Sequence, residues 1–167
     1  MTVGRAGAAW RIVFSRDAAD PSRGSRRTLE SVGLQSWPAS LRSLAARPDL
    51  ASAMAADDLS KVLPAFDAFL EANPGLYAVQ WVGDDGIGRG GSPVSASLPG
   101  YDFRASAATK GSPFVGALTA GKETVIDQPL LEGGTGRFFL VPVASAGRSL
   151  GMVYAIRILP AGVAGGS

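Results

Sequence analysis

The segment from Gly100 to Arg104 brings three chemically useful side chains close together. Tyr101 offers a hydroxyl, Asp102 a carboxylate and Arg104 a guanidinium. Arginine binds carboxylates through paired hydrogen bonds, and neighbouring aromatic rings strengthen such contacts by lowering the local dielectric constant. The segment therefore suits a pocket for a small carboxylate or an amino acid. The local alternative is an Asp102–Arg104 ion pair that fastens the loop, with Tyr101 and Phe103 as packing.

Catalytic chemistry has few candidate residues in this chain. It contains neither histidine nor cysteine, which excludes the usual triads, thiol nucleophiles and the common zinc sites. A hydrolase or transferase with a Ser/Lys site at Lys110 or Lys122 is left, and it would need a buried lysine beside a serine. A cation site at Asp84, Asp85 and Asp127 is disfavoured, because adjacent carboxylates in a strand project to opposite faces. We therefore expect no enzyme, no cofactor and no metal.

Two glycine-containing strings imitate nucleotide-binding motifs. Residues 86–91 satisfy G-x-G-x-x-G, but Ser92-Pro93 and a loop follow where a dinucleotide site needs a helix. Residues 116–122 match G-x-x-x-x-G-K, but Glu123 stands where magnesium binding would need a serine or threonine hydroxyl. The first string is better explained as a hairpin turn, and the second as the end of a helix.

The composition is that of a globular domain with little net charge. Hydrophobic residues make up 46% of the 167 residues, and the net charge of +2 gives no case for nucleic-acid binding. The sequence has no apolar run of about 20 residues and no apolar signal-peptide core at its start. We expect a soluble chain with a poorly ordered arm over 1–27, one domain over 28–158 and a flexible tail over 159–167.

Helices are predicted in the first half of the domain. Apolar spacing and proline positions predict short helices over 39–46 and 47–56. A longer helix follows, with Asp57 as its N-cap and Asn73-Pro74-Gly75 as its end. Pro64 is expected to bend it. An apolar stripe on this helix is predicted to be core, and its members are Leu59, Val62, Leu63, Phe66, Phe69 and Leu70.

The second half reads as an antiparallel sheet with loops. Residues 76–82 are rich in β-branched and aromatic side chains, and Asp85-Gly86 predicts a turn into a short strand over 87–91. A loop over 92–100 precedes a helix that Ser112 caps and Gly121 ends. Three strands in meander follow, over 123–131, 137–144 and 150–158. The predicted class is α+β.

The chain contains, in this order, the segments 72–82 with Asp85-Gly86, 98–103, 130–143 and 147–153. Their order and spacing resemble those of the Cache and CHASE sensor domains. These are PAS-like extracytoplasmic modules of bacterial chemoreceptors, histidine kinases and cyclic-dinucleotide enzymes. The resemblance covers residues 39–158, although no single motif in it is specific.

The resemblance implies a PAS-like α+β fold and a signalling function. N-terminal helices would pack on a central antiparallel sheet of five or six strands. A small organic acid or amino acid would bind between the opposite sheet face and the loops after the first hairpin. The signal would pass through the terminal helices of a homodimer. The chain would be the periplasmic portion of a membrane-anchored receptor in chemotaxis or two-component signalling, with no cofactor.

The resemblance also implies which residues line the ligand pocket. They come from the loop after the first hairpin, from the first strand and from the last two strands. Only one of Gln80 and Trp81 can face the pocket, because side chains alternate along a strand. The alternative is a ligand-free structural or dimerisation module of the same fold. The implied ligand-binding residues are Tyr101, Asp102, Arg104, Lys110, Phe114, Trp81, Gln80, Phe138 and Tyr154, with Phe139 beside Phe138.

Overall fold

The computed structural model describes residues 37–161. The chain divides into two compact units, Met1–Ala39 and Ser40–Ser167, and the sheet and cavity described below belong to the second. The expected arm over 1–27 and residues 162–167 of the expected tail lie outside the described residues. No helix within residues 37–161 combines the length and apolar character that crossing a bilayer requires.

The helices that precede the sheet follow the predicted order. Residues 37–45 are helical, and α2 spans Pro48–Ala55 with its proline in the first turn. The longer helix α3 spans Leu59–Ala72 and contains Pro64 in its interior. Its apolar stripe buries Val62, Phe66 and Phe69, which recur at steps of three and four.

The two ends of α3 show one correction and one confirmation. The N-cap is Asp58, not Asp57, and its side chain makes no capping hydrogen bond. The Asp58 carboxylate instead accepts from the Ser60 hydroxyl at 2.5 Å and pairs with the Lys61 ammonium at 3.3 Å. The helix ends as predicted before Asn73, whose Nδ2 donates to the Phe69 carbonyl at 2.8 Å.

Five antiparallel strands form one sheet in the order β2-β1-β5-β4-β3. The last three strands make the predicted meander, while β5 returns to pair with β1 in the middle of the sheet. This arrangement confirms the predicted α+β class and strand number. The strands are β1 (Ala78–Val82), β2 (Gly88–Ser92), β3 (Thr124–Pro129), β4 (Thr135–Ser145) and β5 (Arg148–Ile158).

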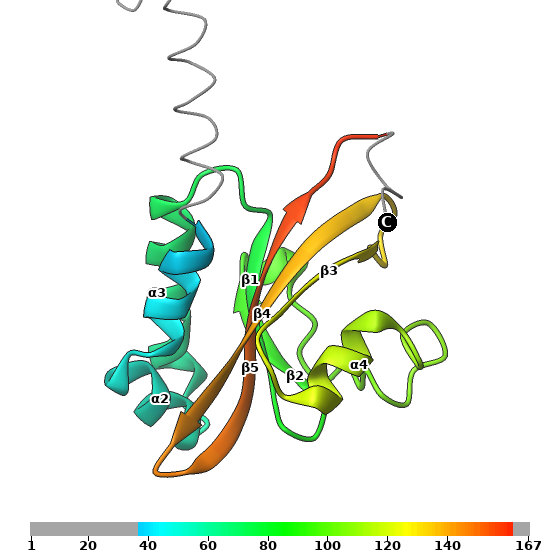
Figure 1. Cartoon of the computed structure of the whole chain (residues 1–167). Helices are drawn as coiled ribbons and strands as arrows, with labels where there is room; N and C mark the ends of the chain where they lie inside the picture. The colour runs from blue at the N-terminus through cyan, green and yellow to red at the C-terminus, as the bar shows by residue number, and fades with distance from the viewer. Residues whose placement is uncertain (1–36, 162–167) are drawn as a thin grey trace, which may run out of the picture. The chain divides into compact units, whose positions relative to one another are not determined.

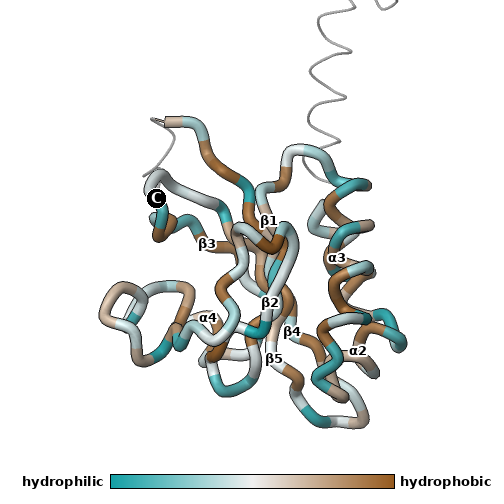
Figure 2. Tube along the Cα trace, turned by 180° about the vertical axis from the view of Figure 1, so that it is seen from behind, coloured by the Kyte–Doolittle hydropathy of each residue, from teal (hydrophilic) through white to brown (hydrophobic). Residues whose placement is uncertain are grey.

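The sheet separates two layers. Helices α2 and α3 cover one face, and α4, over Pro113–Ala120, lies against the other (Figure 1). The caps of α4 are as predicted: the Ser112 hydroxyl accepts from the Val115 amide, and Gly121 ends the helix with φ of +62°. Figure 2 shows hydrophobic residues along the strands between these layers.

Alternation along β1 assigns its side chains to the two layers. The Trp81 indole lies on the side of α2, near Met54, and donates to the Leu150 carbonyl at 2.9 Å. Its neighbour Gln80 therefore faces α4. Tyr154 on β5 pairs with Gln80 and faces the same way. The α4 side of the sheet thus combines polar and aromatic side chains within an otherwise apolar core.

The outer edge of the first hairpin is covered by the segment 98–103. The Gly88 amide donates to the Tyr101 carbonyl, and the Gly88 carbonyl accepts from the Gly100 amide, both at 2.8 Å. The approach is close enough that a Cβ on Gly88 would lie 2.2 Å from the Leu98 carbonyl oxygen. Residues 86–91 therefore form a turn and a strand, as predicted, and the absence of a side chain at Gly88 lets the backbone of segment 98–103 lie close to it.

Candidate ligand-binding site

A cavity of about 150 Å³ lies between the α4 face of the sheet and the segment 96–114. Strands β1, β3, β4 and β5 supply its floor, and α4 with the preceding loop supplies a wall. The residues that line it are Tyr77, Gln80, Ala96, Leu98, Phe103, Ala108, Thr109, Ser112, Pro113, Phe114, Gln128, Pro129, Leu130, Leu131, Glu132, Phe138, Tyr154 and Ile156.

The polar groups of the floor are bonded to one another. The Tyr154 hydroxyl donates to Gln80 Oε1 at 3.1 Å, and Gln80 Nε2 donates to the Ala96 carbonyl at 2.7 Å. Burial raises the pKa of the Tyr154 hydroxyl, because the phenolate would lose its hydration. Tyr154 is therefore neutral at physiological pH and acts as a hydrogen-bond donor. The chain of bonds links β5 through β1 to the 3-10 turn η1, over Val94–Ala96.

Replacing Tyr154 by phenylalanine should lower the free energy of unfolding by about 1–3 kcal/mol. The substitution keeps the ring but leaves buried Gln80 Oε1 without its donor. Urea denaturation of the two proteins measures the difference. Tyr101→Phe is the matched control, because its hydroxyl bonds to Ser106 in a less buried position and should cost less. Equal stability of Tyr154→Phe and the parent protein would contradict this role.

Aromatic rings form the inner wall of the cavity. Phe114 is 1% exposed and contacts three of them, with ring centroids 4.8 Å from Phe103, 4.8 Å from Tyr154 and 5.7 Å from Phe138. The contacts with Phe138 and Tyr154 are edge-to-face, a geometry that fixes the orientation of the rings, and the Phe103 ring is tilted by 44°. The wall therefore offers a ligand a preformed apolar surface from α4, from two strands and from the loop.

The N-terminus of α4 has little capacity left for an anion. Pro113 has no amide hydrogen, the Phe114 amide donates to Gln128 Oε1 at 3.1 Å, and the Val115 amide donates to the Ser112 hydroxyl. A helix N-terminus binds anions through its free amides. Here those amides donate to the side chains of Ser112 and Gln128, so they are not free to bind a ligand.

One charged side chain is found among the described residues that line the cavity. It is Glu132, in the turn between β3 and β4, and it is exposed at the mouth. Glu132 Oε1 accepts a hydrogen bond of 2.5 Å from the hydroxyl of Tyr77, just before β1. This bond raises the pKa of the Tyr77 hydroxyl, since the neighbouring carboxylate disfavours a phenolate. The mouth therefore carries negative charge.

Four of the nine predicted ligand-binding residues line this cavity. They are Gln80, Phe114, Phe138 and Tyr154. Of Gln80 and Trp81, it is Gln80 whose side chain faces the cavity, because Trp81 lies on the helix side of the sheet. Phe139 also lies on that side, where the guanidinium of Arg42 stands 5.3 Å from its ring centroid.

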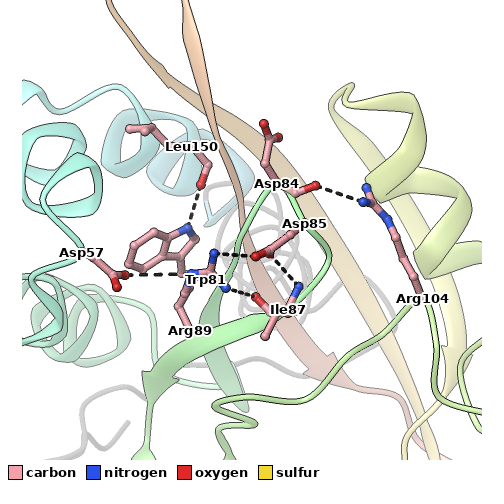
Figure 3. Close-up of polar contacts among 8 residues, drawn as sticks. All are labelled: Asp57, Trp81, Asp84, Asp85, Ile87, Arg89, Arg104 and Leu150. Atoms are coloured by element: carbon pink, nitrogen blue, oxygen red, sulfur yellow. Dashed lines mark hydrogen bonds and ion pairs between the residues drawn. The ribbon is translucent and has the colours of Figure 1, made fainter.

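The loop residues Tyr101, Asp102, Arg104 and Lys110 do not line the cavity. Asp102 Oδ1 accepts from the backbone amides of Arg104 and Ala105 at 3.0 and 2.9 Å, which closes a local turn. The Arg104 guanidinium donates to the Asp84 carbonyl at 3.0 Å, outside the cavity (Figure 3). No Asp102–Arg104 side-chain ion pair occurs in the part of the chain that is described. The local alternative is therefore wrong in its geometry, and a role of these residues in ligand binding stays a prediction.

The three aspartates considered as a cation site have separate partners. Asp85 pairs with Arg89 at 2.9 Å, and Asp127 pairs with Arg137 at 2.7 Å across β3 and β4. The third, Asp84, accepts from the Ser149 hydroxyl at 2.6 Å. Arg89 also lies 3.9 Å from Asp57 in the connection between α2 and α3 (Figure 3). These arginine pairs lower the pKa of both Asp85 and Asp127, first through hydrogen bonds to their carboxylates. The three carboxylates therefore act in separate contacts and do not form one cation site among the described residues.

Several lining residues were missed by sequence reasoning. The sequence carries no local signal for Glu132, and it indicates Phe103 only as packing. Gln128 had a usable signal, since it alternates with exposed Asp127 on β3 and therefore had to face the same layer as Ile126. Others, such as Tyr77 and Thr109, line the cavity because of long-range contacts that local spacing does not encode.

The fold is similar to solved structures of sensor domains. The sensor domain of the histidine kinase DctB from V. cholerae superposes with a TM-score of 0.59 at 16% identity, over 81% of this chain and 52% of that chain. An extracellular ligand binding receptor from Desulfohalobium retbaense DSM5692 gives a TM-score of 0.49 at 15% identity, over 75% and 24%. The ligand-binding domain of the amino acid chemoreceptor PctC from Pseudomonas aeruginosa PAO1, in complex with GABA, gives 0.49 at 23% identity, over 78% and 60%.

These similarities concern the fold. The chain spans between 24% and 60% of the length of the solved chains just described. No protein-family model matches the sequence, and no curated protein matches it either. The five-stranded antiparallel sheet with its helices, and its similarity to the DctB domain, confirm the α+β fold that the resemblance implied. This chain therefore has the α+β fold of a histidine kinase sensor domain.

Proposed function

We propose that this chain is the ligand-binding sensor domain of a bacterial signal-transduction receptor, either a chemoreceptor or a histidine kinase. The observation that carries the proposal is a cavity of about 150 Å³ on the sheet face opposite α2 and α3, in a chain with a sensor-domain fold. The domain would lie outside the cytoplasmic membrane as part of an anchored, dimeric receptor. Binding would be transmitted through its terminal helices.

The lining favours binding over reaction. Gln80, Tyr154 and Thr109 are held in hydrogen bonds within the protein. The lysines considered for a Ser/Lys site, Lys110 and Lys122, are both exposed, and neither lines the cavity. A cavity with preformed aromatic walls and satisfied polar groups can hold a ligand without activating a nucleophile. This supports a binding module over the hydrolase or transferase alternative.

The size of the cavity limits the ligand. An apolar cavity of about this volume in another protein holds benzene, so a ligand of roughly six to eight non-hydrogen atoms is expected. A small organic acid or amino acid of this size remains the class predicted from Arg104. The arrangement of the described residues supports that class less well, because the guanidinium lies outside the cavity.

Thermal unfolding of the full 167-residue chain tests the proposal. The panel contains small acids, amino acids, amines, alcohols and aromatic compounds. A ligand at about 100 times its dissociation constant adds about 2.7 kcal/mol to the stability of the folded protein, which raises the melting temperature on the order of 10 °C. Ala96→Phe should abolish the rise by filling the cavity, whereas Ala107→Phe, at an exposed position outside it, should not.

Two results would contradict the proposal. One is a panel in which no compound changes the melting temperature, which would favour the ligand-free structural module. The other is a rise that Ala96→Phe leaves intact although the variant is folded, because binding would then occur elsewhere. Circular dichroism of both variants verifies their folding.

A further inference from the structure

We propose that the ligand's charged group is an ammonium bound by Glu132 at the cavity mouth, while its apolar part enters between the aromatic rings. This inference rests on the proposed function, because it assigns the ligand class and a new binding residue to the same cavity. The sequence instead predicts that a carboxylate binds to the Tyr101–Arg104 segment, and it assigns no role to Glu132.

The first argument is the charge of the lining. Within the described part of the chain, the residues around the cavity include one carboxylate and neither arginine nor lysine. An anionic group entering this space would lose hydration and meet a negative mouth. The first amides of α4 are occupied by Gln128 and Ser112, so they do not compensate it. A cationic group is instead attracted by the Glu132 carboxylate at the mouth.

The second argument is the position of Glu132. It lies at the exposed rim and not in the floor, so an ammonium bound there keeps part of its hydration. Its Oε1 accepts from the Tyr77 hydroxyl, and within residues 37–161 no donor is hydrogen-bonded to its Oε2. The Tyr77 hydrogen bond holds the carboxylate in one orientation, as a preorganised binding group requires. A second donor can therefore bind without displacing the first.

The third argument is the wall behind this carboxylate. Phe114, Phe138 and Tyr154 present a largely apolar aromatic surface, which suits an alkyl chain. The buried polar groups of the floor already have partners. A ligand with a polar group at one end and an alkyl chain at the other therefore places its chain inward.

Four probes of equal chain length separate the possibilities. They are n-pentylammonium, 1-pentanol, pentanoate and 5-aminopentanoate, each titrated calorimetrically into the full chain. Pentylammonium should bind at least tenfold more tightly than pentanoate or pentanol. Glu132→Gln should reduce pentylammonium binding about tenfold and leave pentanol binding unchanged. Glu123→Gln is the matched control, since Glu123 pairs with Arg42 outside the cavity and should have no effect on either probe.

The zwitterionic probe distinguishes two sources of the ammonium. If 5-aminopentanoate binds like pentylammonium and depends on Glu132, an amino acid supplies the group. If it binds only weakly while pentylammonium binds tightly, a simple amine supplies it. Both results support the ammonium contact.

Other outcomes overturn the inference and leave the proposed function standing. These are tighter binding of pentanoate than of pentylammonium, or pentylammonium binding that Glu132→Gln does not change, provided that Ala96→Phe blocks the probe. The proposed function fails separately, if no compound in the wider panel binds in a manner that Ala96→Phe prevents. A folded Glu132→Gln variant, verified by its melting curve, is required for each comparison.

Discussion

Replacing Phe114 by alanine should lower the free energy of unfolding by about 3–5 kcal/mol, the usual cost of removing a buried phenylalanine. Phe114 is the residue that joins α4 to the sheet, because its ring contacts Phe103 on the loop and both Phe138 and Tyr154 on the strands. Its removal leaves a void beside an existing cavity, so the neighbouring rings lose contacts on two sides. Urea denaturation with intrinsic fluorescence measures the change.

Phe114→Leu is the matched control for this prediction. Leucine retains most of the apolar volume and should cost less than half as much as alanine. A difference of under about 1 kcal/mol between Phe114→Ala and the parent protein would show that α4 is held by other contacts. The alanine variant should also lose ligand-induced stabilisation, because the wall of the cavity is no longer formed.

Replacing Gly151 by alanine should also be severely destabilising, by about 3 kcal/mol or more. Gly151 lies in β5 with φ of +100°, and a Cβ there would stand 2.0 Å from the Val82 carbonyl oxygen and 2.8 Å from Gly83. The atoms that would have to move are backbone atoms of β1 and its turn. The pairing of the two central strands would therefore be disturbed.

Gly75→Ala separates the clash from the backbone strain. Gly75 has the same φ of +100°, but a Cβ there meets nothing within 4 Å. This control should cost only about 1–2 kcal/mol, the strain of a non-glycine residue at positive φ. Chemical denaturation of both variants gives the comparison. Equal losses would show that the close approach at Gly151 relaxes without cost.

The fold was predictable wherever a local signal determined the structure. Ser112 before Pro113 and Gly121 after the helix fixed α4 to the residue, because caps depend on a few neighbouring atoms. Side-chain alternation along β1 means that Gln80 and Trp81 face opposite sides of the sheet, but it does not say which of them faces the cavity. Only the packing of α2 on the sheet decided between them, and that contact is remote in sequence.

The candidate site was harder to predict for the same reason. The segment with Tyr101, Asp102 and Arg104 has the composition of a binding loop, but its backbone hydrogen bonds to Gly88 turn it along the sheet edge. Asp102 then satisfies nearby amides, and Arg104 reaches the Asp84 carbonyl. Phe103, between them, faces the cavity instead. Side-chain chemistry alone does not reveal this direction, because it depends on pairing with a strand already in place.

The position of β5 in the sheet determines the order in which this domain can be completed on the ribosome. β5 lies between β1 and β4, yet it is the last of the five strands in the sequence. The hairpin of β1 and β2 therefore emerges with one side unpaired and waits for a partner about seventy residues later. Until residues 148–158 leave the exit tunnel, the floor of the cavity lacks Tyr154. A nascent chain of this domain can therefore complete the cavity only after β5 has been inserted between β1 and β4.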